Sequence, residues 1–331
     1  MKFSCPDGVK GGDWHEGENV RKLSYLLIAT LLTIPAGPSR AGVGQAGGLF
    51  LQIAPDARST AMGETGVAHA RGAQVPAWNP GGLGFLEYSG VAGTYFKWLP
   101  YLADDLYYLH FSYVLPVEGI GTFGVSVPYL SLGEQQRVSA TGDSQGTFKS
   151  SDMALSLSYG ALINDRLGVG SNLKIIRSAL SDEDDGVGTS FALDVGVTAR
   201  VMPRFTVAGV LQNLGTEIKY TDSNQGDPLS RNLKVGAALT ALEDESNSLL
   251  LAVDLNRMLL EDGGNILNVG LEYWYQDLIA LRTGYVHDAD GDVKTPTFGG
   301  GLQWNMYRID FSYTTSSTLQ DITKFTISAR F

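Results

Sequence analysis

Residues 189–201 read TSFALDVGVTARV, a run in which bulky apolar residues alternate with small, polar or charged ones. Successive side chains of a β-strand point to opposite faces of the sheet, so this period of two predicts a strand with unlike faces. The apolar face carries Phe191, Leu193, Val195, Val197, Ala199 and Val201. The opposite face carries Ala192, Asp194, Gly196, Thr198 and Arg200.

The same alternation recurs from Tyr88 to the C-terminus and predicts fourteen strands. They cover residues 88–98, 106–115, 122–131, 152–162, 166–177, 189–201, 205–214, 231–242, 248–256, 265–275, 278–287, 298–304, 307–315 and 323–331. Short connections alternate with long polar ones, which are 132–151, 178–188, 215–230 and 288–297. An even number of strands, with all long loops at one end, is typical of transmembrane barrels.

The alternation alone leaves open which face meets water, because a soluble sandwich turns its apolar face inward. Fourteen strands, however, enclose a lumen too wide to fill with Val and Leu side chains. Aromatic residues fall on the apolar faces, where membrane-interface girdles form: Tyr107, Phe111, Tyr113, Phe205 and Tyr273. We therefore predict an all-β fold, a 14-stranded antiparallel transmembrane β-barrel over residues 88–331, in contact with the lipids of the bacterial outer membrane.

The last eight residues, KFTISARF, alternate strictly and end on Phe331. A final strand that pairs with the first leaves no open edge in the barrel. The stretch also resembles the C-terminal signal of bacterial outer-membrane proteins, whose terminal aromatic residue is read by the barrel insertion machinery. This resemblance implies that Phe331 is a C-terminal assembly signal.

The N-terminal region predicts a signal peptide. Arg21 and Lys22 precede the twelve-residue apolar run at 23–34, and Ser39-Arg40-Ala41 follows as a small-x-small cleavage site. The alternative is a buried helix. We expect residues 1–41 to be removed, and residues 1–19 to be a mis-called start.

Removal of residues 1–41 takes away five basic and four acidic residues and leaves a net charge of −12. A surface this acidic excludes nucleic acid as an expected partner. The single cysteine, Cys5, lies in the removed part, so we expect no disulfide in the mature chain.

Residues 42–87 lack the strand pattern. A short helical pattern lies around 56–62, and Asn79-Pro80 followed by Gly81-Gly82 indicates a turn. The segment has few charges, which favours an N-terminal plug folded into the lumen. A periplasmic linker is the alternative.

This segment resembles the N-terminal signature of the PorV/PorQ family, relatives of the FadL-type outer-membrane transporters. The resemblance rests on Ala57-Arg58, Ala61-Met62-Gly63, Ala77-Trp78-Asn79-Pro80 and Gly82-Leu83, with Leu211–Gly215 (LQNLG) further on. Gly81 departs from the Ala common in the family. The implied plug motif is Arg58, Met62, Gly63, Trp78, Asn79, Pro80 and Gly82.

The resemblance implies two functions. FadL-type members pass hydrophobic molecules across the outer membrane, so the expected partners are hydrophobic small molecules. PorV serves type IX secretion and receives secreted proteins by their C-terminal signal domains. A general diffusion barrel is a third possibility, which a plug disfavours.

Few residues suggest an enzyme. His110 and Ser112 share a strand face, as a lipid-cleaving barrel would need, but no acidic residue is placed to orient the histidine. HDADGD at 287–292 starts like a calcium loop but lacks its Gly and closing Glu, and SDEDDG at 181–186 is a second acidic cluster. We expect solvated loops, no cofactor, no metal and no catalytic residue.

Charged residues on the polar faces are expected inside the lumen, where they would pair and hold the plug. They are Lys174, Asp194, Arg200, Lys234, Asp254, Glu272, Arg282, Arg308, Asp310 and Arg330.

Pro128 lies inside FGVSVPYLSLG, residues 123–133, a pattern that otherwise reads as strand. Proline cannot donate a ladder hydrogen bond, and a closed barrel has no edge to accommodate it. We predict irregular pairing over 127–130, beside a gap in the wall. The resemblance to FadL-type transporters implies a strand-3 kink that opens a side window here. The alternative is that the strand ends near Val127.

Overall fold

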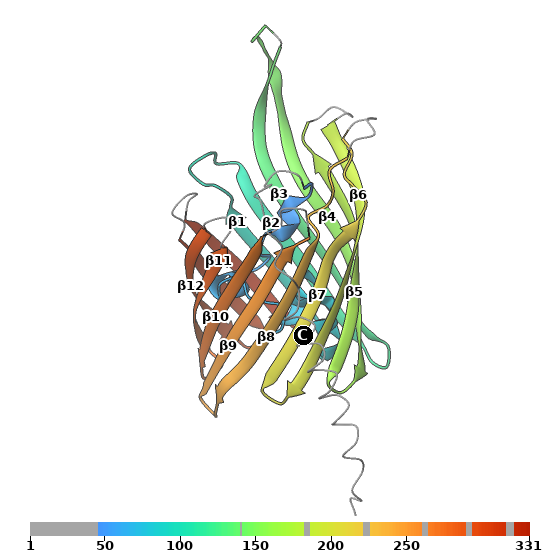
Figure 1. Cartoon of the computed structure of the whole chain (residues 1–331). Coiled ribbons are helices and arrows are strands. Elements are labelled where there is room, and N and C mark those ends of the chain that lie inside the picture. The colour runs from blue at the N-terminus through green and yellow to red at the C-terminus, as the bar shows by residue number, and fades with distance from the viewer. Residues whose placement is uncertain are drawn as a thin grey trace, which may run out of the picture. The chain divides into compact units, whose positions relative to one another are not determined.

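The structure is a computed structural model that describes residues 46–139, 141–181, 186–220, 226–259, 264–288, 293–315 and 321–331. Its strands form one closed antiparallel barrel in which each strand pairs with its neighbours in sequence and β1 pairs with β14 (Figure 1). The predicted fold class is confirmed. The predicted signal peptide lies outside the described residues, as do most of the two acidic loops.

The strands are β1 (Gly90–Lys97), β2 (Leu106–Val117), β3 (Gly121–Val138), β4 (Ser144–Asn164), β5 (Leu167–Ala179), β6 (Val187–Met202), β7 (Phe205–Gly215), β8 (Asn232–Glu243), β9 (Asn247–Met258), β10 (Asn265–Tyr275), β11 (Ile279–Asp288), β12 (Val293–Trp304), β13 (Tyr307–Thr314) and β14 (Ile322–Arg330).

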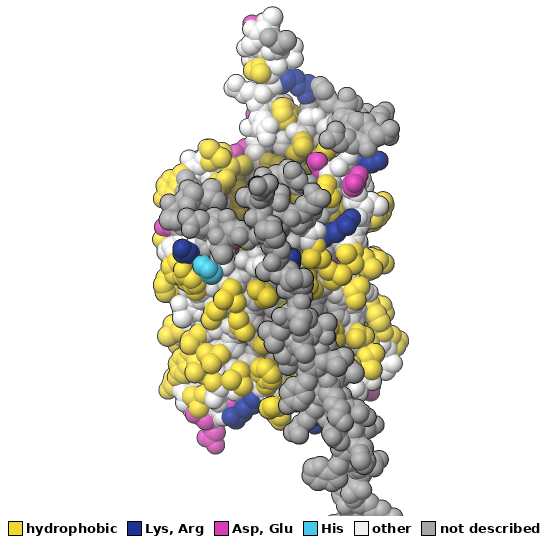
Figure 2. All heavy atoms as spheres, viewed as in Figure 1, with side chains coloured by type: hydrophobic (Ala, Val, Ile, Leu, Met, Phe, Trp, Pro, Cys, Tyr) yellow, Lys and Arg dark blue, Asp and Glu magenta, His cyan; other side chains and the backbone are white. Residues whose placement is uncertain are grey.

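The two faces of the wall differ as the alternation predicts. On β6, Phe191 is 59% exposed on the outside, whereas Ser190 and Asp194 are fully buried on the inside. Figure 2 shows hydrophobic side chains over most of the visible wall. An apolar outer face with polar and charged side chains on the inner face suits a barrel surrounded by lipid.

The barrel closes between its first and last strands. Gly90 on β1 pairs with Arg330 on β14, and Tyr95 pairs with Phe325. Beyond this ladder, the backbone N–H of Phe331 donates to Ser89 O at 2.9 Å, and Ser89 N–H donates to Phe331 O at 3.0 Å. The terminal residue therefore takes part in closure of the wall.

Residues 46–89, here called the inner segment, lie inside the barrel, where they are drawn in blue (Figure 1). They form short elements: η1 (Leu49–Gln52), α2 (Ala57–Ala61), η2 (Gly72–Gln74), α3 (Val75–Trp78) and η3 (Pro80–Phe85). Helix α2 begins after Asp56, whose carboxylate caps the helix by accepting from Ser59 N–H at 2.8 Å. Met62 and Leu83 have no exposed surface.

Glycines on the inner face of the wall allow the inner segment to lie against backbone. A Cβ at Gly170 would lie 2.2 Å from Pro80 O, and one at Gly284 would lie 2.0 Å from Gly63 N. Any side chain there would displace the segment. Gly63 itself has φ 68°, a left-handed conformation that favours glycine.

Two long loops of the sequence prediction are wrong. In the predicted loop 288–297, residues 293–297 already belong to β12 and pair with β11. Most of residues 132–151 belong to β3 and β4, which pair as far as Val138 and Ser144 and extend beyond the other strands (Figure 1). The alternative that strand 3 ends near Val127 is also wrong. The extension has few apolar residues, so its sequence carries no strong alternation.

Among the described residues, no helix has the length and apolar character needed to cross a membrane.

Candidate functional site

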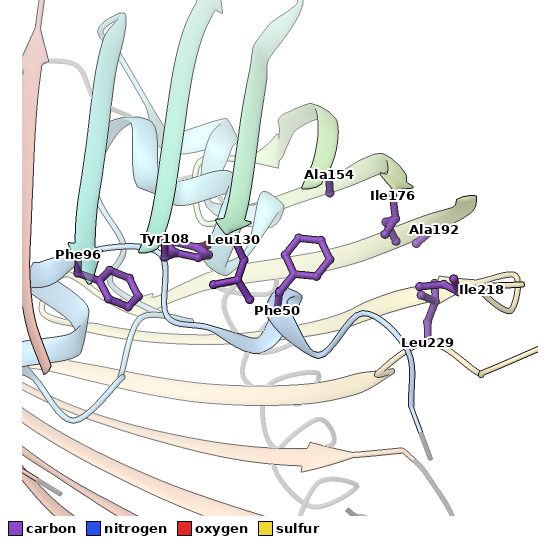
Figure 3. Close-up of a cluster of buried hydrophobic side chains, with 9 residues drawn as sticks. All are labelled: Phe50, Phe96, Tyr108, Leu130, Ala154, Ile176, Ala192, Ile218 and Leu229. Atoms are coloured by element: carbon purple, nitrogen blue, oxygen red, sulfur yellow. The ribbon is translucent and has the colours of Figure 1, made fainter. Parts of the chain in front are cut away.

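An apolar cluster occupies the inner wall of β1 to β6. Figure 3 shows Phe50, on η1, between Leu130 of β3 and residues of β4 to β6. The side chains of Phe50 and Leu130 are almost fully buried. We call this set the lumen cluster; it consists of Phe50, Phe96, Tyr108, Leu130, Ala154, Ile176, Ala192, Ile218 and Leu229.

Next to the lumen cluster is a cavity of about 40 Å³, here called the lumen cavity. Tyr108 and Ala154 belong to both. Polar residues of the wall complete the lining, namely His110, Ser126, Ser156, Asn172 and Lys174. An apolar cluster and a polar cavity therefore adjoin inside one half of the barrel.

Pro128 lines the lumen cavity, and the wall is irregular beside it. On the β2 side the ladder is continuous, with Val127 opposite Phe111 and Pro128 opposite His110. On the β4 side, Ser126 pairs with Ser156 and the next pair is Tyr129 with Met153. Val127 and Pro128 thus have no ladder partner among the described residues of β4. Proline lacks the N–H that this side requires.

Tyr129 and Leu130 pair regularly on both sides, so the irregularity is shorter than the predicted 127–130. A second irregularity follows between Ser131 and Glu134, near the base of the projecting hairpin.

The opposite half of the lumen holds a buried network of charges. Arg58 of α2 donates from Nε and Nη2 to the two oxygens of Glu272 on β10, both at 2.8 Å. Arg282 of β11 contacts Glu272 at 2.6 Å and Asp310 of β13 at 2.8 Å. Paired guanidinium and carboxylate groups of this kind fix geometry as well as charge. The network joins the inner segment to three strands.

His69 completes this network from the inner segment. Arg58 Nη1 lies 3.1 Å from His69 Nδ1 and donates to His69 O at 3.0 Å, and His69 Nε2 lies 3.0 Å from Thr65 Oγ1. Burial lowers the pKa of His69 well below its ordinary value, and the positive charge of Arg58 lowers it further. The imidazole is therefore neutral at pH 7, with Nδ1 as acceptor.

Met62 and Gly63 follow α2, and the other plug-motif residues lie between the end of α3 and the first turn of η3. Trp78 Nε1 donates to Asp56 Oδ2 at 2.6 Å. Asn79 Oδ1 accepts from Gly81 N–H at 2.9 Å, and Asn79 Nδ2 donates to Val197 O of β6 at 3.0 Å. Pro80 follows as the first residue of η3. A Cβ at Gly82 would lie 3.0 Å from Val75 Cγ1.

The remaining predicted lumen charges lie on the inward faces but in separate places. Lys174 pairs with Asp194 at 2.7 Å. Asp254 accepts from the backbone N–H groups of Gly66 and Val67 at 2.7 and 3.0 Å. The others lie over aromatic rings: Lys234 over Trp78, Arg200 over Phe85, Arg308 over Trp274 and Arg330 over Tyr88.

Sequence reasoning missed Asp56, His69 and Lys324 as lumen residues. Lys324 Nζ donates to Ala54 O at 3.0 Å and lies over the ring of Phe96. Lys324 directly precedes the apolar Phe325 in the alternating last strand, so it falls on the polar face. That position could have identified it as a lumen residue. No comparable pattern marks Asp56 and His69, because the inner segment has no regular period.

His110 and Ser112 are buried on the inner face of β2. Among the described residues, no group of three or more His, Cys, Asp or Glu side chains is placed to hold a metal ion.

Comparison with known families decides what this barrel is. The family model described as type IX secretion system protein PorV matches residues 40–263. The chain belongs to the PorV family. A PorV-family barrel with this outer surface is a bacterial outer-membrane protein. No curated protein sequence matches the chain.

Solved structures share the fold of this PorV-family chain at low sequence identity. The Ralstonia pickettii toluene transporter TbuX is 15% identical with a TM-score of 0.57, over 83% of this chain and 98% of its own. The Pseudomonas putida toluene transporter TodX is 12% identical with a TM-score of 0.55, over 82% and 95%. A Pseudomonas aeruginosa FadL homologue is 10% identical with a TM-score of 0.50, over 83% and 98%.

Proposed function

We propose that this PorV-family barrel binds hydrophobic molecules in its lumen and passes them across the outer membrane. The observation that carries the proposal is the continuity of three features on β2 to β5. The lumen cluster shares Tyr108 and Ala154 with the lumen cavity, and the cavity is lined by Pro128, one of the two β3 residues without a ladder pair on β4. TbuX and TodX, which share this fold, are toluene transporters, in agreement with this proposal.

In this function the inner segment serves as the plug. Phe50 belongs to the lumen cluster from η1. In the same element, Gln52 Nε2 donates to Ser230 O at 2.7 Å, just before β8, and Gln52 Oε1 accepts from Asn232 Nδ2 of β8 at 2.8 Å. A hydrophobic molecule displaces Phe50, occupies the cluster and leaves through the wall beside Pro128 into the lipid. No catalytic step is needed, and we expect the barrel not to be an enzyme.

The test places a bulky side chain between the lumen cluster and the lumen cavity and measures the uptake of a hydrophobic molecule. Ala154→Phe places a ring where the cluster and the cavity meet, and we expect uptake of radiolabelled toluene by cells expressing the barrel to fall at least several-fold. Leu155→Phe is the matched control, because Leu155 is the next residue on the lipid-facing side of β4 and is 40% exposed. Equal uptake by both variants and the unaltered chain would contradict the proposal.

A second function is favoured by the family match, whose model describes a type IX secretion protein. The hairpin of β3 and β4 beyond Ser131 projects past the rest of the wall and offers exported proteins an exposed arm (Figure 1). We propose that it receives secreted proteins by their C-terminal signal domains. Deletion of residues 134–149 should abolish co-purification of such proteins while toluene uptake persists. If the secreted proteins still co-purify with the deletion variant, the hairpin is not their binding site.

For assembly, we propose that the barrel insertion machinery reads Phe331, in line with its place at the closing seam.

A further inference from the structure

The lumen cavity contains buried polar atoms that the chain does not satisfy. His110 Nδ1, Ser156 Oγ and Asn172 Oδ1 have no hydrogen-bond partner among the described residues. These three side chains are at most 3% exposed and come from the inner faces of β2, β4 and β5. Because an unmet buried polar group is costly, three of them around one cavity indicate a site for a polar ligand atom.

The hydrogen bonds of Asn172 define what the ligand must offer. Asn172 Nδ2 donates to Pro76 O at 2.9 Å and to Asp194 Oδ2 at 2.8 Å. Both partners are acceptors, which fixes the orientation of the amide and leaves Oδ1 as an acceptor. A ligand must therefore supply a donor to Asn172. The Ser156 hydroxyl can accept or donate, so a ligand oxygen can also accept there.

The charges around the cavity argue against an anionic ligand. Lys174 is the one cation among the described lining residues. It is already paired with Asp194 Oδ2 at 2.7 Å and donates to Asn213 Oδ1 at 2.8 Å. A carboxylate would bring a second negative charge near Asp194 and would have no donor for Asn172. An uncharged hydroxyl has both a donor and an acceptor.

The rest of the lining is apolar and includes Leu51, Ile53, Pro128 and Ala154. Leu51 and Ile53 also pack against the lumen cluster, so an apolar chain attached to the polar atom would continue into that cluster. We propose that the lumen cavity binds the hydroxyl end of an uncharged long-chain alcohol and discriminates against the corresponding carboxylate. This inference rests on the proposed hydrophobic passage and specifies its ligand.

The experiment compares three probes with the same chain length: 1-dodecanol, dodecanoate at pH 8 and dodecane. Binding of each radiolabelled probe to the full chain is measured in nanodiscs of dimyristoylphosphatidylcholine, with empty nanodiscs to subtract partitioning into lipid. We expect dodecanol to bind about tenfold more tightly than dodecanoate, since at least one hydrogen bond and the charge differ. Dodecanoate that binds as tightly as dodecanol would overturn the inference.

Two serine variants locate the site. Ser156→Ala should weaken dodecanol binding by about 3- to 10-fold, the effect of one lost hydrogen bond, and leave dodecane binding unchanged. Ser158→Ala is the matched control, because Ser158 is a buried, unpartnered serine two residues along β4 that does not line the cavity. Equal losses in the two variants would refute the location.

Ser156→Thr keeps the hydroxyl and should retain the preference for dodecanol over dodecanoate; loss of that preference would contradict the role of the hydroxyl. The dodecane result separates the two proposals. If dodecane binds but the alcohol has no advantage, the headgroup inference fails and hydrophobic passage stands. If none of the three probes binds above empty nanodiscs, hydrophobic passage itself fails.

Discussion

The two halves of the lumen hold the inner segment by different physical means. On β10 to β13, Arg58 of α2 is joined to Glu272, Arg282 and Asp310 through contacts of 2.6 to 2.8 Å. On β2 to β5, the segment packs through the lumen cluster and through close approaches such as Pro80 against Gly170, beside a cavity with unpartnered polar atoms. One half anchors the segment and the other is where a molecule can enter between segment and wall. Under the proposed function, retention belongs to the first half and passage to the second.

The largest expected effect comes from breaking the anchor. Glu272→Gln removes the carboxylate between two buried guanidinium groups, and Glu272 has no exposed surface. Removal of one partner from a buried ion pair is expected to lower the free energy of unfolding by about 3–5 kcal/mol. Urea unfolding in lipid vesicles measures this loss. Glu134→Gln, on the exposed hairpin, is the control; a loss below 1 kcal/mol for Glu272→Gln would mean that this half is not the anchor.

A smaller effect is expected where α2 and its following turn touch the wall. In Gly284→Ala the new methyl group would lie 2.0 Å from Gly63 N, so the inner segment must shift. Overpacking of this kind is expected to cost about 1–3 kcal/mol. Gly93→Ala is the matched control, because a Cβ at that strand position meets nothing within 4 Å. Equal unfolding free energies for the two variants would show that the contact is loose.

The smallest expected effect is a pH dependence of the anchor. The lowered pKa of His69 means that the folded chain binds fewer protons there than the unfolded chain does. Its contribution is constant above the unfolded pKa and declines as the pH falls. Between pH 6.5 and 5.5 the loss is expected to be about 1 kcal/mol. His69→Gln should remove this part of the slope, and unfolding series at both pH values for the two chains provide the measurement. Parallel slopes would contradict a neutral His69.

The sequence predicts the wall well because lipid imposes a simple rule on it. The alternation at 189–201 places Asp194 and Phe191 on opposite faces, and the structure does so. The alternation is lost in the projecting part of β3 and β4, where the strands still pair. The alternation also does not predict which lumen charges form ion pairs. Glu272 is predicted to face the lumen, but fourteen inner faces offer many possible partners. Its pairing with Arg58 depends on how the inner segment folds.

The separation of Arg58 from Glu272 along the chain, 214 residues, has a consequence for assembly. Contacts between distant residues form late, because the intervening chain must first be brought together. The inner segment precedes the first strand, yet its strongest attachments are to β10, β11 and β13. The residues that bind the inner segment are therefore not in place until the second half of the wall has formed. We therefore expect docking of the inner segment to be a late step of biogenesis, with Arg58 hydrated until β10 is in place.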